Sequence, residues 1–178
     1  MHIFRKVQNM IDIKTERLFL RNVQQSDAAV MHDYRNKPIC AKFQRGQRTA
    51  LQDIQALVNA RQRDTISDQE NFLIAVSLKE TDEMIGEIVV MPNDGCFSIG
   101  YTFHYNFHRK GYAFEALTRL ISLLHQTYPE MEFISFTEPE NIPSRKLLEK
   151  LGYSDMGYVP QVTSQMYGKW IKDTPADQ

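Results

Sequence analysis

One junction constrains the fold of this chain more than any other: near Gly111 the hydrophobic pattern changes from that of a strand to that of a helix. Residues 96–105 read CFSIGYTFHY, a β-rich run. Beyond Gly111 the apolar side chains recur at helical spacing; they are Ala113, Phe114, Leu117, Leu120, Ile121 and Leu124. A strand that runs through a short loop into an amphipathic helix is typical of chains that mix α and β structure.

The loop of this junction has the composition of an anion site. Asn106–Lys110 is polar and contains the basic side chains of Arg109 and Lys110. Gly111 allows the backbone to turn and a ligand to approach closely. Helix N-termini carry unpaired N–H groups and a partial positive charge, so the turn is suited to a pyrophosphate. The patterns GxxxxGK[ST] and GxGxxG are both absent, which excludes the P-loop and the dinucleotide-binding turn.

The remaining pattern alternates strands and helices on what we expect to be one mixed sheet. Pro92–Gly95 between two β-rich runs predicts a hairpin. The predicted strands are Ile13–Arg21, Asn71–Leu78, Met84–Met91, Cys96–Tyr105, Met131–Thr137, Tyr153–Pro160 and Val162–Trp170. The predicted helices are Ala28–Tyr34 after an N-cap at Ser26, one from Thr49, one from Gly111 and Pro143–Leu151. The fold class is therefore α/β in the α+β sense, with 1–178 as a single domain, 1–12 as an N-terminal extension or short helix and about 172–178 as a tail that frays.

Composition and charge exclude several classes of function. A net charge of -1 lacks the basic face of a nucleic-acid binder. Cys40 and Cys96 have no CxxC spacing, and His104 and His108 straddle a strand end, so we expect neither a disulfide framework nor a metal site. No apolar run approaches the roughly 18 residues of a membrane helix, and Met1–Met10 has no apolar core of signal-peptide length, so we expect a cytoplasmic protein with no membrane partner.

Four ordered segments, covering about residues 13–155, resemble the GCN5-related N-acetyltransferases (GNAT), and within them the ribosomal-protein N-terminal acetyltransferases of the RimJ/RimL type. They are Thr15-Glu16-Arg17-Leu18-Phe19-Leu20-Arg21, Ile99-Gly100-Tyr101, His108 to Ala116, and Asn141 to Tyr153. The family turn, Q/R-x-x-G-x-G/A, reads His108-x-x-Gly111-x-Ala113 here, so His108 departs from the pattern at its first position.

The resemblance implies the GNAT fold, a single mixed, mostly antiparallel twisted sheet flanked by helices, whose central strands splay to admit the pantetheine arm of acetyl-CoA. It implies that the N–H groups of about Arg109–Phe114 bind the pyrophosphate, that Asn141 bonds the pantetheine arm and that Ser144 points at the thioester sulfur. Asn141 is equally well an ordinary helix N-cap. The cofactor-binding residues expected are Phe103, His108, Arg109, Lys110, Gly111, Tyr112, Ala113, Phe114, Asn141 and Ser144.

The chemistry of acetyl transfer requires a neutral amine, donors for the oxyanion and a donor for the departing thiolate. A backbone N–H around Phe103 or Tyr105 is the candidate oxyanion donor. Many relatives place a tyrosine acid seven residues after the motif asparagine, where this chain has Leu148. We therefore predict Ser144 as the donor to the sulfur. The candidate bases are Glu138 and Glu87; Glu87 is preferred because it interrupts an apolar strand, although a solvent-facing glutamate would give the same pattern.

The predicted reaction is transfer of an acetyl group from acetyl-CoA to a primary amine by direct attack. The resemblance suggests a protein N-terminus as the acceptor. A small amine such as a polyamine or an aminoglycoside is the alternative, and a non-catalytic domain that binds or senses acyl-CoA is another. A homodimer is common in the family and is a candidate assembly here. Acceptor contacts are expected from the segments Asn36–Asp68 and Gln161–Met166.

Overall fold

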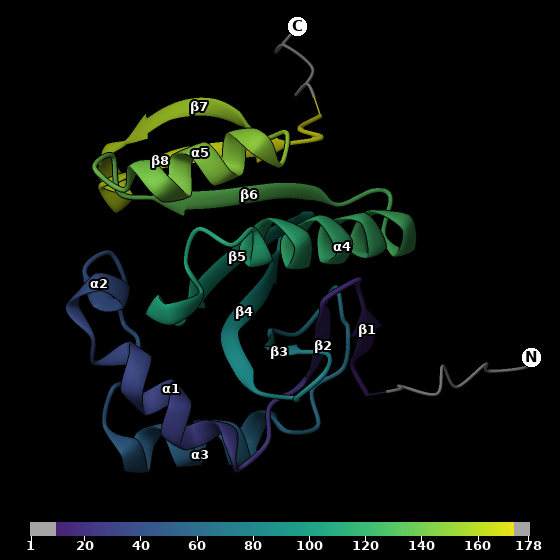
Figure 1. Cartoon of the computed structure of the whole chain (residues 1–178). Coiled ribbons are helices and arrows are strands. Elements are labelled where there is room, and N and C mark those ends of the chain that lie inside the picture. The colour runs from purple at the N-terminus through teal and green to yellow at the C-terminus, as the bar shows by residue number, and fades with distance from the viewer. Residues whose placement is uncertain (1–9, 173–178) are drawn as a thin grey trace, which may run out of the picture.

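A computed structural model describes residues 10–172 of the chain, and in that part eight strands form one sheet (Figure 1). The strands are β1 (Asp12–Lys14), β2 (Leu18–Asn22), β3 (Phe72–Leu78), β4 (Met84–Asn93), β5 (Cys96–Phe103), β6 (Glu132–Thr137), β7 (Ser154–Val159) and β8 (Ser164–Lys169). The helices are α1 (Asp27–Arg35), α2 (Pro38–Ala41), α3 (Leu51–Arg61), α4 (Tyr112–Thr127) and α5 (Ile142–Lys150), with 3₁₀ turns at Tyr105–Phe107 and Pro160–Val162.

The sheet order is β1-β2-β3-β4-β5-β6-β8-β7, and only the central pair β5 and β6 is parallel among the described strands. The expected mixed, mostly antiparallel sheet flanked by helices is therefore confirmed. The hairpin at Pro92–Gly95 is confirmed as well. Asn93 pairs with Cys96, which leaves Asp94 and Gly95 as a two-residue loop with φ of 49° and 84°, the positive values of a type I′ turn.

Helices cover both faces of the sheet. Strand β3 accordingly buries its side chains on both faces. Phe72, Ile74 and Val76 pack in the core beneath α4 and α5, whereas Leu73 and Ala75 pack in a second core against α1 and α3. Successive side chains of a strand point to opposite faces, so a continuous apolar run indicates a strand covered on both sides. In Figure 1, α1 and α3 accordingly lie together, away from α4 and α5.

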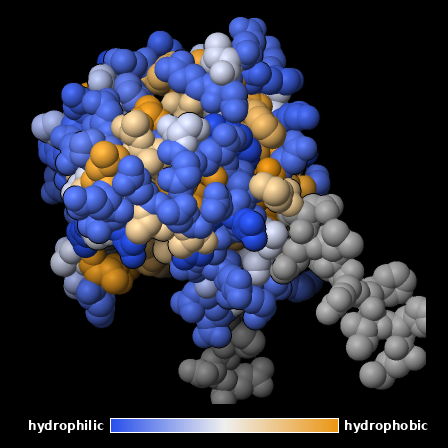
Figure 2. Space-filling view, turned by 90° about the horizontal axis from the view of Figure 1, so that it is seen from below, coloured by the Kyte–Doolittle hydropathy of each residue, from blue (hydrophilic) through white to orange (hydrophobic). Residues whose placement is uncertain are grey.

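The outer surface of the molecule remains polar where helices cover the sheet. Ile54 and Val58 of α3, one helical turn apart, are fully buried, while Gln52 and Gln55 are exposed. The view from below is correspondingly mostly hydrophilic, with scattered apolar side chains (Figure 2). No helix in residues 10–172 is long and apolar enough to span a bilayer.

The structure corrects three boundaries predicted from the sequence. The strand predicted over Ile13–Arg21 is two strands, because Thr15 donates its N–H to Leu18 and turns the chain between β1 and β2. The strand predicted to Tyr105 ends at Phe103, and Tyr105 lies in the 3₁₀ turn Tyr105–Phe107. Helix α2 was not predicted; Pro38, which stops α1, occupies its first turn, a position where proline costs nothing.

The ends of the chain agree only in part with the predicted domain limits. The sheet begins inside the expected extension 1–12, since Ile11 is buried and Asp12 belongs to β1. Of the extra segment or short helix considered for residues 1–12, residues 1–9 lie outside the described residues, as do residues 173–178 of the tail expected over about 172–178.

Strands β5 and β6 separate soon after they meet. They pair at Cys96–Ser98 with Glu132–Ile134, and the described residues show no pairing between them beyond that point. Just past the last pair, the Ser135 hydroxyl donates a 3.1 Å hydrogen bond to the Ile99 carbonyl. Each strand keeps its outer neighbour, β4 for β5 and β8 for β6, so the sheet opens only between the central strands. The expected splay of the central strands is confirmed.

Candidate active site

The loop before α4 offers a row of free backbone donors. Within residues 10–172, no acceptor is found for the N–H groups of residues 109–114, and the first bonded one is that of Glu115, which donates to the Gly111 carbonyl at 3.0 Å. Arg109 and Gly111 have φ of 60° and 80°, and these left-handed residues turn the chain into the helix. Helix α4 has 16 residues, so its dipole adds to the positive potential at this end. The residues of this loop therefore fit a pyrophosphate.

Thr15 and Arg17, just before β2, form a clamp that holds the N-terminus of α4. This contact gives the Thr15–Arg21 segment of the resemblance a structural role. The Arg17 N–H and guanidinium donate to the two oxygens of Glu115 at 2.8 and 2.7 Å, and its guanidinium also donates to the Lys110 carbonyl at 3.0 Å. The Thr15 hydroxyl bonds the same carboxylate at 2.5 Å. Burial opposes ionisation of Glu115, but the hydrogen bonds from Thr15 and Arg17 outweigh it and hold its pKa below the ordinary value. The clamp fixes the direction in which the free N–H groups point.

His108 takes a structural part at the position where relatives carry glutamine or arginine. Its Nε2 lies 2.7 Å from the Phe103 carbonyl and so ties the loop to the end of β5. The Cys40 thiol approaches the same carbonyl at 3.4 Å. The Phe103 side chain is buried in the core, whereas the Tyr105 hydroxyl donates to Asp33 at 3.0 Å. The roles of Phe103 and His108 in cofactor binding, and of a nearby backbone N–H in oxyanion binding, stay predictions.

Ser144 lies beside a tyrosine that sequence reasoning did not select. Asn141 caps α5, because its side-chain oxygen accepts the Ser144 N–H at 3.3 Å, as the helix-cap interpretation expected. The Ser144 hydroxyl is 2.9 Å from the hydroxyl of Tyr101 on β5. Burial raises the pKa of Tyr101 to about 12, against a smaller lowering by the bond to Ser144. The sequence signals for Tyr101 were the motif Ile99-Gly100-Tyr101 and the alternation of Tyr101, Phe103, Tyr105 and Phe107, which is typical of sheet packing or of an acceptor groove. Its contact with Ser144 spans 43 residues.

Leu148 stands where many relatives carry a tyrosine acid, and it is 1% exposed in the core beneath α5. This position therefore belongs to the packing of the helix. Any hydroxyl that serves the departing thiolate has to come from elsewhere, and Tyr101 and Ser144 are the pair that the splay brings together.

Glu87 is buried rather than exposed, so the solvent-facing alternative is wrong. Its register opposite Ala75 and Thr102 directs it to the face that α1 covers. There Arg35, at the end of α1, donates to its two oxygens at 2.8 and 2.5 Å, and Gln47 adds a third bond at 3.1 Å. Both oxygens of the predicted base are thus already engaged by a guanidinium. Glu138, the other candidate base, accepts a hydrogen bond from Arg45.

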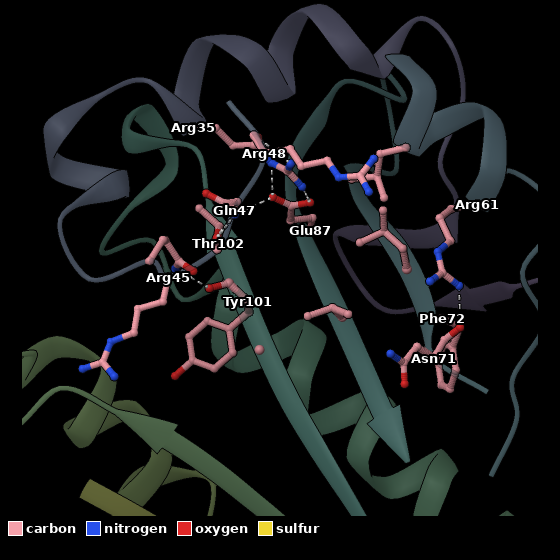
Figure 3. Close-up of a pocket in the computed structure, with 16 residues that line it drawn as sticks. Arg35, Arg45, Gln47, Arg48, Arg61, Asn71, Phe72, Glu87, Tyr101 and Thr102 are labelled. Carbon is pink, nitrogen blue, oxygen red and sulfur yellow. Dashed lines mark hydrogen bonds and ion pairs between the residues drawn. The ribbon is translucent and has the colours of Figure 1, made fainter. Parts of the chain in front are cut away.

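A cavity of about 270 Å³ lies on this buried pair (Figure 3). The loop between α2 and α3, residues 44–48, borders it, with α3 and strands β3, β4 and β5. Arg45 links this loop to the Val162 and Thr163 carbonyls at 2.7 and 3.1 Å, so both segments expected to contact the acceptor meet near the cavity. Figure 3 shows the Tyr101 hydroxyl pointing away from Glu87, and Tyr101 thus connects the cavity with Ser144.

The described residues contain no group of three or more histidine, cysteine or acidic side chains that could hold a metal ion. Cys40 and Cys96 are free thiols.

Comparisons with known proteins agree with this geometry. A family model described as "Acetyltransferase (GNAT) domain" matches residues 17–154. The chain is 29% identical over 148 residues to the uncharacterized N-acetyltransferase YnaD of Bacillus subtilis, covering 82% of this chain and 84% of that one. It is 30% identical over 155 residues to the uncharacterized N-acetyltransferase p20 of Bacillus licheniformis, covering 83% and 85%.

Among solved structures, the chain is similar in fold to RimL, the ribosomal L7/L12 alpha-N-protein acetyltransferase, in complex with coenzyme A. The TM-score is 0.74 at 16% identity, with 90% of this chain and 97% of that one covered. At this identity the likeness shows a shared fold.

Proposed function

The chain belongs to the GNAT family of acetyl-CoA-dependent N-acetyltransferases, and from this premise we propose that it acetylates an α-amine bound in the cavity beneath the loop 44–48. The amine nitrogen attacks the thioester carbonyl directly. The new C–N bond forms as the C–S bond breaks, the amine loses its proton to solvent, and CoA leaves as a thiolate. The observation that carries this proposal is the position of Tyr101, which borders the acceptor cavity and bonds Ser144 across the splay.

We assign cofactor binding to the residues of the loop. The free N–H groups of residues 109–114 would hold the pyrophosphate, with Arg109 and Lys110 adding charge. Acetyl-CoA supplies the activated acyl group, and the splay between β5 and β6 is where its pantetheine arm would lie. Asn141 and Ser144, at the start of α5, would border that arm.

For the leaving group we propose a hydrogen bond rather than full proton transfer. With the pKa of Tyr101 raised to about 12 and that of an ordinary thiol about 8.5, moving the proton to the sulfur would be uphill by roughly 5 kcal/mol. A hydroxyl that remains protonated can still donate to the developing thiolate, which stabilises it as charge appears. Tyr101 and Ser144 would share this task, either directly or with one hydroxyl polarising the other.

We propose an α-amine because both carboxylate oxygens of Glu87 already accept hydrogen bonds. At pH 7.5 about a quarter of an α-amine with a pKa near 8 is neutral, but only about one in a thousand of a lysine amine with a pKa of 10.4. A lysine therefore needs a strong base, and the only carboxylate lining the cavity already accepts bonds from Arg35 and Gln47. The arginines around the cavity would lower the pKa of a bound amine further. The likeness to RimL supports a protein N-terminus as the source of that amine.

Turnover on an amine panel tests the proposal. We expect release of CoA thiol and an acetyl mass increment on peptides with a free N-terminus, and much less on the same peptides with a blocked N-terminus and a lysine. Tyr101→Phe and Ser144→Ala should each lower kcat by about 10- to 100-fold with little change in the KM for acetyl-CoA. Binding of acetyl-CoA without turnover on any amine would instead favour an acyl-CoA sensor. An unchanged kcat in both variants would remove the pair from the mechanism.

A further inference from the structure

Resting on this proposed function, we infer that the acceptor carries an anionic group, a carboxylate or a phosphate, close to its reactive amine, and that Arg48 binds that group. The lining of the cavity is strongly biased in charge. Among residues 10–172, four arginines line it and Glu87 is the only carboxylate; the arginines are Arg35, Arg45, Arg48 and Arg61.

Three of these arginines already have acidic partners. Arg35 is paired with Glu87 and Arg45 with Glu138, while Arg61 lies 3.7 Å from Asp64 and donates to the Asn71 carbonyl at 2.9 Å. Their guanidinium groups are therefore already engaged within the protein. They form the polar wall of the cavity rather than its free binding group.

Arg48 differs from the other three. Within residues 10–172 no carboxylate lies within 4 Å of its guanidinium, and its side chain donates no hydrogen bond. Its backbone is fixed all the same, because its carbonyl accepts a 2.9 Å hydrogen bond from buried Arg35. Figure 3 shows it next to the Arg35–Glu87 pair. An exposed guanidinium that is not engaged by a carboxylate of the described residues, beside a cavity, matches a planar carboxylate or a phosphate.

The residue before Arg48 adds an independent sign that the site is incomplete. The Gln47 amide nitrogen donates to Glu87 and to Thr102, each at 3.1 Å. A carboxylate can only accept, so this orientation of the amide follows from the chemistry. It leaves the Gln47 side-chain oxygen buried without a hydrogen-bond partner. A primary amine carries N–H donors. With its anionic group bound to Arg48, the acceptor would donate an N–H to the Gln47 oxygen, so one molecule would pair with both consecutive residues.

The same charges argue against polycations. A polyamine or an aminoglycoside would have to place several ammonium groups beside these arginines, with no free carboxylate in the lining to receive them. The anionic amine has two sources, the N-terminus of an acidic peptide or a small molecule such as an amino acid or an amino phosphate. The shared chemistry is the amine and the neighbouring anion.

The test compares matched acceptors. One arm uses N-terminal peptides that differ only in having two glutamates or two lysines after the first residue. The second arm uses free serine, serinamide, O-phosphoserine and spermidine, so that the anionic acceptors keep an α-amine. We expect kcat/KM to be at least 10-fold higher for the anionic member in at least one arm, and the preference to shrink with added salt. The arm that shows it identifies the source.

Two arginine variants assign the effect to the cavity. Arg48→Gln should raise the KM for the preferred anionic acceptor about 10-fold or more, with kcat and acetyl-CoA binding little changed. Arg63→Gln is the matched control, since Arg63 is also exposed and without an ion pair in the described chain but does not line the cavity. Equal turnover of anionic and cationic acceptors, a preference for spermidine, or an equal effect of Arg63→Gln would overturn the inference. Absence of turnover on every acceptor would instead contradict the proposed function itself.

Discussion

At the scale of single residues, Glu87 and Arg35 form a buried ion pair beneath the proposed acceptor cavity, with side chains 5% and 4% exposed. Such a pair gains Coulomb energy in a low dielectric but has lost the hydration of both ions, so its net contribution to stability is small. Breaking it is costly, because one charge is left buried and unpaired. The pair therefore holds α1 and the cavity floor in place whether or not Glu87 meets the substrate.

Glu87→Gln separates the two roles of this carboxylate. As the structural partner of Arg35, Glu87 is needed for stability, so Glu87→Gln should lower the free energy of unfolding by roughly 3 kcal/mol. Adding Arg35→Gln to this variant should restore part of the loss. Urea denaturation measures this, with Glu138→Gln, in a more exposed pair, expected to cost less than about 1 kcal/mol. If Glu87 is also the general base, kcat of the folded variant falls about 100-fold in addition to the loss of stability.

At the scale of elements, the join between β5 and α4 is the feature to which we assign binding of the acetyl-CoA pyrophosphate. Gly111 makes the left-handed turn there, at φ 80°, and a Cβ on it would meet only the Arg17 guanidinium, at 3.4 Å. A side chain at this position therefore strains the backbone and stands beside the free N–H groups without a clash in the core. Gly95, in the β4–β5 hairpin, has φ 84° with nothing within 4 Å of a Cβ.

These two glycines give a matched pair of variants. Gly111→Ala and Gly95→Ala should each cost about 1 kcal/mol of stability, since both force alanine into the left-handed region. Only Gly111→Ala should lose most of the rise in Tm that acetyl-CoA induces, with a Kd raised about 10-fold or more. Thermal unfolding with and without acetyl-CoA measures both effects. An equal response to acetyl-CoA in the two variants would contradict the assignment of the loop.

At the scale of the whole molecule, carboxylates hold separate parts of the fold together. Glu115 joins α4 to the start of β2, and Asp82, in the β3–β4 turn, joins Arg21 of β2 at 2.7 Å. Burial opposes ionisation of Asp82, but the bonds from Arg21 and Ser77 lower its pKa, as those from Thr15 and Arg17 lower that of Glu115. Both carboxylates are thus more acidic in the folded chain than in the unfolded one.

The lowered pKa values of Asp82 and Glu115 set the direction in which stability changes with pH. A carboxylate with a lowered folded pKa contributes stability that is present above its unfolded pKa, near 4, and is lost as the pH falls through the folded value. Tm should therefore decrease as the pH falls from about 5 to 3. Glu115→Gln should lower Tm at pH 7 and show a shallower decrease on acidification, so that the two curves converge near pH 3. Parallel curves for variant and wild type would show that Glu115 contributes nothing to acid sensitivity.

Much of this could be predicted from the sequence, because the signals are local. The order of strands and helices, the Asp94-Gly95 hairpin, the glycine turn into α4 and the Asn141 cap all depend on residues within a few positions of one another. Periodicity, backbone φ preferences and capping act at that range. Such signals failed where a turn lies within a run that alternation alone predicts as one strand: Thr15 donates to Leu18 between β1 and β2, and Tyr105 begins a 3₁₀ turn after β5.

The sequence by itself thus determined the elements and the loop suited to acetyl-CoA, whereas only the tertiary structure decided which side chains share the site. Arg35 and Glu87 are 52 residues apart, Tyr101 and Ser144 are 43 apart, and Thr15 and Glu115 are 100 apart. Each pair meets because of sheet order, strand register and the separation of β5 from β6. No local preference encodes such meetings, since they arise from the packing of two cores against opposite faces of one sheet.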